Sequence, residues 1–179
     1  MEKTGVNTQR RSGTYALIID ALFIALTFVA TWQINIRLPL MGAGGLIHLG
    51  NVPLFIAAFL YGRRTACLAG SIGMALFDLM SGWTVWAPFT FVIVGLMGYC
   101  AGLIEEKRPF EKNIFNYVLA VAIAVIIKIV GYYFAEVILY GNWAAPFGSI
   151  PGNIIQVTFG GILVVLFIDQ LKKIVNSRR

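Results

Sequence analysis

Long apolar runs recur along this sequence, and they constrain the fold more than any other feature. A helix needs about 20 consecutive apolar residues to cross the hydrocarbon core of a bilayer. The runs predict six membrane-spanning helices, at about residues 14–34, 46–61, 65–80, 84–104, 114–140 and 150–171. Composition agrees, because 59% of the residues are hydrophobic and 12% are charged, which is too apolar for a soluble domain. We therefore expect an all-α integral membrane protein that forms a single domain over residues 1–179.

The positive charges predict how the helices are oriented. Twelve of the 14 Lys and Arg residues fall in the two tails, in the turn between spans two and three, and in the turn between spans four and five. Only Arg37 is predicted on the other side, and Lys128 lies within a span. By the positive-inside rule, both termini are expected in the cytoplasm. This asymmetry accounts for the net charge of +6, so the expected partner is the lipid bilayer and no nucleic acid.

A glycine-rich first outer loop, residues 38–49, leads into the second span, which is short and is expected to be tilted or broken near its outer end. Glycine gives such a loop many accessible conformations. The loop is predicted either to cover a binding site as a lid or simply to permit a tight re-entrant path. In the first case, His48 and Asn51 would point at whatever the loop covers. Asn51 is also a candidate helix cap, with Pro53 tolerated in the first turn.

The fifth span carries a polar stripe. Lys128, Tyr132 and Glu136 recur every four residues, which places them on one helix face. A lysine near mid-bilayer costs several kcal/mol unless it faces protein or water, so it is a candidate functional residue. A structural pair between Lys128 and an acid inside the bundle is the alternative. Because Tyr132 and Glu136 lie progressively closer to the outside, the stripe is typical of one wall of an outward-facing pocket.

Amides and tryptophans add to the polar groups of the outer half. Asn153 and Gln156 share one face in the first two turns of span six, where amides are costly unless they are paired with a neighbouring helix or a ligand. Trp86 is either an interfacial anchor or a flat wall for an aromatic ligand. The pattern predicts a site for a small polar aromatic solute. Its candidate residues are His48, Asn51, Trp86, Lys128, Tyr132, Glu136, Asn153 and Gln156.

Other features are assigned more local roles. Ala21 and Ala25 lie on one face of the first span, where they allow close approach either of a neighbouring helix or of a partner subunit. Asp78 is expected to cap or pair locally, with ligand contact as the minor alternative. The charged turn that begins at Glu105 is predicted to be solvated.

In these respects the chain resembles the substrate-binding (S) components of energy-coupling factor (ECF) vitamin transporters. The resemblance covers essentially the whole length and is most specific in the runs L-G-N-V-P-L-F-I-A-A-F-L-Y-G-R-R, G-S-I-G-M-A-L-F-D and G-L-M-G-Y-C-A-G-L-I. In many relatives the turn after the second helix reads Gly-Pro-Lys, whereas here it is Gly62-Arg63-Arg64, a departure that keeps the charge.

The resemblance implies a multi-pass subunit of the bacterial plasma membrane that captures a vitamin on the outer side. Such a subunit works with a transmembrane coupling (T) subunit and two cytoplasmic ATPases, and needs no cofactor. Ala21 and Ala25 look like the alanine motif with which the family docks on the coupling subunit. The overall look is closest to members assigned to pyridoxine or hydroxymethylpyrimidine. Riboflavin is a larger alternative.

Two other functional classes are considered. A membrane enzyme would need a paired acid and base or a metal set. His48 is the only histidine, and Asp20 and Asp78 are predicted at opposite faces, so neither an enzyme nor a metal site is expected. A channel or scaffold without ATPases would line a through-going polar path, whereas the polar residues gather in the outer half. The sequence has no Gly-x-x-x-x-Gly-Lys-Ser/Thr loop, so ATP hydrolysis would fall to partner subunits.

Overall fold

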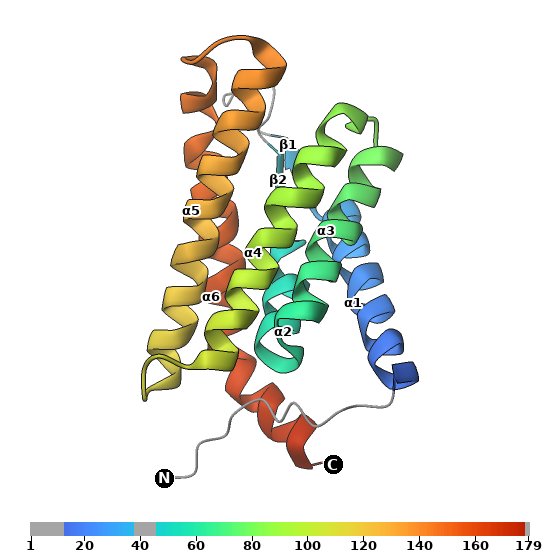
Figure 1. The fold of residues 1–179 in the computed structure, drawn as a ribbon, viewed down its shortest axis with the longest axis vertical. Coiled ribbons are helices and arrows are strands. Elements are labelled where there is room, and N and C mark those ends of the chain that lie inside the picture. The colour runs from blue at the N-terminus through green and yellow to red at the C-terminus, as the bar shows by residue number, and fades with distance from the viewer. Residues whose placement is uncertain (1–12, 38–45, 178–179) are drawn as a thin grey trace.

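The computed structural model describes residues 13–37 and 46–177. Figure 1 shows helices lying side by side, joined by short turns, with one small hairpin. In chain order, the elements of the described residues are α1 (Gly13–Gln33), β1 (Asn35–Arg37), β2 (Leu46–His48), α2 (Asn51–Tyr61), α3 (Arg63–Met80), α4 (Ala87–Lys107), α5 (Asn113–Tyr140) and α6 (Ile150–Ser177). Two short 3-10 turns, η2 (Thr84–Trp86) and η3 (Ala145–Gly148), precede α4 and α6. The predicted all-helical bundle is confirmed, with the antiparallel β1–β2 pair as a small addition.

Helix length separates the six helices into groups. Four helical segments are long and apolar enough to cross a membrane: Gly13–Gln33, Thr84–Lys107, Asn113–Tyr140 and Ala145–Ser177. Helix α2 has 11 residues, which extend about 16 Å at 1.5 Å per residue. That is about half the hydrocarbon thickness of a bilayer. The expected break near the outer end of the second run is present, because residues 46–48 form a strand and the helix begins only at Asn51. That all six helices cross the bilayer stays a prediction.

The helices alternate in direction, so their ends gather at two poles. In Figure 1 the start of α1, the α2–α3 turn, the α4–α5 turn and the end of α6 lie at the bottom, while the hairpin and the other turns lie towards the top. The described basic turns and the end of α6, with Arg63, Arg64, Lys107, Lys112 and Lys172, therefore share one pole. We call it the basic pole and the opposite end the hairpin pole. The grouping is the one that the positive-inside argument requires.

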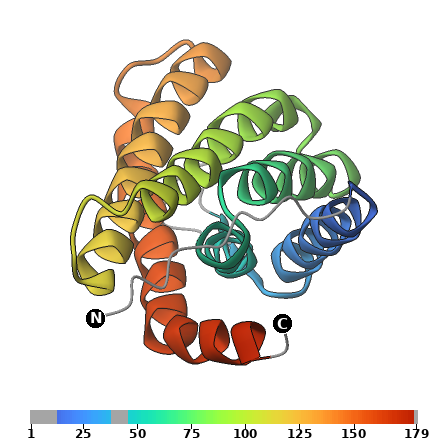
Figure 2. The same ribbon diagram turned by 60° about the horizontal axis from the view of Figure 1, so that its bottom comes forward.

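Helix α2 lies in the middle of the bundle, where Figure 2 shows it nearly end-on between the other helices. Leu54, Phe55 and Phe59 are completely buried. Beside it, glycines on α4 allow α3 to approach closely. A Cβ atom on Gly98 would collide with the backbone of Ala66, because only a glycine leaves enough space there.

A polar cluster ties three helices together at the basic pole. Glu105 of α4 is 1% exposed, and its Oε1 atom contacts Arg108 Nη2 at 2.5 Å and Lys172 Nζ at 2.6 Å. Lys172 also donates to the Tyr117 hydroxyl at 2.8 Å, and that hydroxyl donates to Asp169 Oδ1 at 2.7 Å. We call these five residues the basic-pole cluster. The prediction of a fully solvated turn is wrong for Glu105, because Lys172 of α6 and Arg108 enclose its carboxylate.

The first helix is held near its N-terminal end, at the basic pole, and exposes most of its surface. Asp20 is buried, accepts a hydrogen bond of 2.7 Å from the Thr65 hydroxyl, and lies 3.2 Å from Arg64 Nη2. Ala21 and Ala25 are both exposed, so they face away from the bundle. The structure therefore does not use this alanine pair for packing within the chain.

Candidate substrate-binding site

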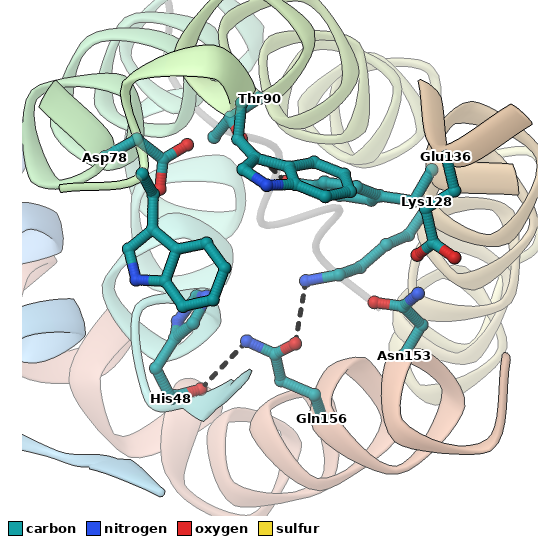
Figure 3. A pocket seen from close by; sticks show the side chains of 10 residues that line it. His48, Asp78, Thr90, Lys128, Glu136, Asn153 and Gln156 are labelled. Atoms are coloured by element: carbon teal, nitrogen blue, oxygen red, sulfur yellow. Dashed lines mark hydrogen bonds between the residues drawn. The ribbon is translucent and has the colours of Figure 1, made fainter. Parts of the chain in front are cut away.

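A cavity lies near the hairpin pole, between the ends of α3 to α6 and strand β2. It encloses about 60 Å³, several times the roughly 10–15 Å³ that one water molecule requires. Figure 3 shows side chains converging on it from every side. They belong to His48, Asp78, Trp83, Trp86, Thr90, Lys128, Tyr132, Glu136, Asn153 and Gln156.

Lys128 projects from the middle of α5 into the cavity. It is 3% exposed, and its Nζ atom donates a hydrogen bond of 2.9 Å to Gln156 Oε1. Gln156 Nε2 in turn donates to the backbone oxygen of His48 at 3.3 Å, as the dashed lines in Figure 3 show. Among the described residues no carboxylate lies within ion-pair distance of Lys128. The Lys128–acid ion pair that the sequence offered as an alternative is therefore not formed. The ammonium group donates to the neutral side-chain amide of Gln156 instead.

Aromatic rings form one wall of the cavity. The rings of Trp86 and Tyr132 have centroids 6.2 Å apart at an interplanar angle of 38°. The Tyr132 hydroxyl shares a hydrogen bond of 2.9 Å with Thr90 Oγ1. Because Trp86 is 8% exposed, the interfacial-anchor interpretation is wrong for this residue. It ends η2, just before α4, and its ring packs against the rings of Tyr132 and Tyr140.

Two carboxylates face the cavity from different helices. Glu136 on α5 and Asp78 on α3 are both buried, and Figure 3 places them on opposite sides of the cavity. The Oδ2 atom of Asp78 has no hydrogen-bond partner among the described residues. The Asp78 backbone oxygen accepts a hydrogen bond of 2.9 Å from the Trp83 amide, which closes the turn after α3 and brings both side chains to the same wall.

Comparisons with known proteins agree with this arrangement of helices. A sequence profile described as "ECF-type riboflavin transporter, S component" matches residues 12–173. The chain belongs to this family of ECF S components. It is a transport subunit that binds substrate, not an enzyme, and it is a multi-pass membrane protein.

Individual relatives give the same picture. The chain is 31% identical over 147 residues to the thiamine precursor transporter HmpT of Lactococcus lactis subsp. cremoris, covering 82% of this chain and 81% of that protein. It is 30% identical over 131 residues to an uncharacterised protein of Pyrococcus woesei, covering 72% and 83%. A solved structure, described as the S component of a bacterial ECF transporter, matches with a TM-score of 0.70 at 20% identity and covers 92% of this chain and 99% of that one. At that identity the structure supports the fold alone.

Seven of the eight candidate residues predicted from the sequence line the cavity of this S component: His48, Trp86, Lys128, Tyr132, Glu136, Asn153 and Gln156. The last five of these could be grouped from sequence spacing alone, because those on α5 recur every four residues and those on α6 lie three residues apart. The predicted lid falls largely on residues 38–45, which lie outside the described residues. Its described end is strand β2, where His48 pairs with Asn35.

Asn51 is the exception. It does not line the cavity, and neither of its amide atoms has a hydrogen-bond partner among the described residues. It does not cap α2 either, because the capping position is Gly50 and no side chain caps this helix. Asn51 instead packs against α6, where a Cβ atom on Gly160 would lie 3.0 Å from the Asn51 Cβ atom. Contact between Asn51 and a ligand therefore stays a prediction.

Sequence reasoning missed three lining residues, namely Asp78, Trp83 and Thr90. Thr90 could have been found from its spacing, since it follows Trp86 by four residues, about one helical turn. Asp78 carries the general signal of an ionisable residue in an apolar segment, but a single sequence does not distinguish ligand contact from the local capping or pairing that is expected of it. Among the described residues, no group of three or more His, Cys, Asp or Glu side chains could hold a metal ion.

Proposed function

We propose that this S component captures a small hydroxymethylated heteroaromatic vitamin precursor of the hydroxymethylpyrimidine type. The observation that carries the proposal is the composition of the cavity. Trp86 and Tyr132 offer flat apolar surface to a ring, while Asn153 and Gln156 offer amides to ring nitrogens and hydroxyl groups. A few placed polar groups within an apolar, concave site are typical of sites for small organic ligands.

The relatives favour a pyrimidine over the other candidate ligands. The Lactococcus relative is described as a thiamine precursor transporter, and thiamine contains a hydroxymethylpyrimidine-derived ring. Pyridoxine shares the hydroxymethyl groups and the ring size, so it is the nearest competitor. Riboflavin is the second candidate, because the matching family is described by that vitamin, although it is larger.

The proposal includes the surroundings of the subunit. As an S component, the chain would work with a transmembrane coupling subunit and two cytoplasmic ATPases, which supply the energy of ATP hydrolysis. The exposed pair Ala21 and Ala25 on α1 is the proposed docking face. The basic pole would face the cytoplasm, which puts both termini inside and the cavity towards the outer side.

Ligand titration of the purified protein tests the proposal. Trp83 and Trp86 line the cavity, so tryptophan fluorescence should report binding of hydroxymethylpyrimidine, pyridoxine and riboflavin, added separately. We expect the pyrimidine to bind most tightly, and Asn153→Ala and Gln156→Ala each to weaken it about 5- to 10-fold, the value of one neutral hydrogen bond. Asn176→Ala, which removes an exposed amide at the far end of α6, is the matched control. Unchanged affinity in both cavity variants would contradict this site.

A further inference from the structure

Asp78 differs from the buried carboxylates Asp20 and Glu105 in that, among the described residues, no cation lies within ion-pair distance of it. Its side chain lines the cavity and is 8% exposed, and its Oδ2 atom has no hydrogen-bond partner among the described residues. One oxygen of Asp20 and one of Glu105 also lack a hydrogen-bond partner, but Asp20 is paired with Thr65 and Arg64, and Glu105 is paired with two cations. A buried carboxylate without compensation is costly. The Asp78 carboxyl group is therefore placed where a ligand could donate a hydrogen bond to its Oδ2 atom.

The surroundings of Asp78 define what such a ligand must bring. The Thr90 hydroxyl, which shares a hydrogen bond with the Tyr132 hydroxyl, also lies beside the Asp78 carboxyl group. Lys128 donates to Gln156 on the other side of the cavity. A carboxyl group offers two oxygens on one edge and accepts hydrogen bonds. The ligand edge that faces Asp78 must therefore carry a donor, and a second hydrogen-bonding atom beside it would use both oxygens.

We infer that Asp78 selects ligands with an aminopyrimidine edge, in which an exocyclic amine stands next to a ring nitrogen. The amine donates to one carboxyl oxygen, and a single proton lies between the other oxygen and the ring nitrogen. The pair carries no net charge, whichever partner holds that proton, so it suits a site of low dielectric constant. The inference rests on the proposed function, since it specifies which part of a vitamin precursor the site reads.

The same edge excludes the two competing vitamins. The ring nitrogen of pyridoxine has no neighbouring amine, so it can make one contact with a carboxyl group but not two. The corresponding edge of riboflavin has an N–H group flanked by two carbonyl oxygens, which a carboxylate would repel. A site that leaves buried polar groups unpaired with the wrong ligand discriminates strongly. Asp78 would thus separate a pyrimidine precursor from both.

A cycle that combines a change in the protein with a change in the ligand tests this role. The probes are 4-amino-5-hydroxymethyl-2-methylpyrimidine and its analogue with hydrogen in place of the amine. In the unaltered protein, loss of the amine is expected to weaken binding by about 10- to 100-fold, the range for hydrogen bonds to charged groups. In Asp78→Ala, the two probes should bind with the same affinity within about 3-fold. The matched control, Glu136→Ala, changes the other cavity carboxylate and should keep the discrimination.

The outcomes separate this inference from the proposed function. If the protein binds the aminopyrimidine but Asp78→Ala still discriminates between the probes, the role of Asp78 is overturned and the proposed function stands. If Glu136→Ala alone loses the discrimination, the edge is read by the opposite wall and the inference is likewise overturned. If neither probe binds the unaltered protein, both proposals fall. Asp78→Asn, whose amide can still donate to the ring nitrogen and accept from the amine, should retain discrimination, and Asp78→Leu replaces the alanine variant if that one does not fold.

Discussion

Two polar clusters lie near opposite ends of the same apolar bundle, and they differ in whether their buried charges form ion pairs. In the basic-pole cluster, Glu105 binds Arg108 and Lys172 through one oxygen, so its charge is compensated within the chain. In the cavity, Lys128 donates to a neutral amide, and no described residue forms an ion pair with Lys128 or Asp78. Removing a charge from water is expensive in both places. At the basic pole, ion pairs join the helices; at the cavity, we expect the charges without an ionic partner to contact the ligand.

The largest expected effect comes from breaking the paired cluster. Glu105→Ala would leave Arg108 and Lys172 largely buried without their shared partner, and removing one member of a buried ion pair costs about 3–5 kcal/mol. The free energy of unfolding in detergent, measured by titration with a denaturing detergent, should fall by that amount. Glu111→Ala, at an exposed position in the same turn, should change it by less than about 0.5 kcal/mol. Equal stability of the two variants would show that the cluster does not hold the helices.

Removing the charge of Lys128 in the cavity should lower ligand affinity rather than stability. Lys128→Met keeps the length of the side chain but not its charge, so affinity for the ligand should fall by about 10- to 100-fold, because a charged hydrogen-bond donor is lost. Stability should stay equal or rise, since a buried charge without an ionic partner is gone. Fluorescence titration and thermal unfolding of the same sample measure both quantities, with Lys112→Met at an exposed site as the control. A large loss of stability with unchanged affinity would give Lys128 the structural role instead.

The smallest expected effect probes the aromatic wall. Tyr132→Phe retains the ring that faces Trp86 but removes the hydroxyl bonded to Thr90. A single hydrogen bond between neutral groups contributes about 1 kcal/mol, so ligand affinity should fall by about 3- to 10-fold. Thr90→Val removes the other half of the same bond. If the two hydroxyls act as a unit, the double variant should lose no more affinity in the titration than the larger single effect.

Much of the fold and part of the site could be predicted from the sequence, for reasons that individual residues make clear. Lys128, Tyr132 and Glu136 share a face because a helix repeats every 3.6 residues, and that information is local. The burial of Glu105 is not local, because it depends on Lys172, 67 residues further along the chain. The place of Asp78 in the cavity is not local either, because other lining residues come from β2, α4, α5 and α6, whose approach no short-range pattern predicts.

The short helix α2 has a consequence for the size of the ligand. Its 11 residues begin at Asn51, and the segment that would continue it towards the hairpin pole is strand β2 instead. His48 of that strand lines the cavity, so the chain reaches the cavity wall in extended form rather than as a further turn of α2. We expect the position at which α2 begins to influence the size of the cavity, while most of the lining side chains come from the helices around it. Different parts of the chain would then determine the size and the identity of the ligand. A later start of α2 would enlarge the cavity without changing the residues that contact the ligand.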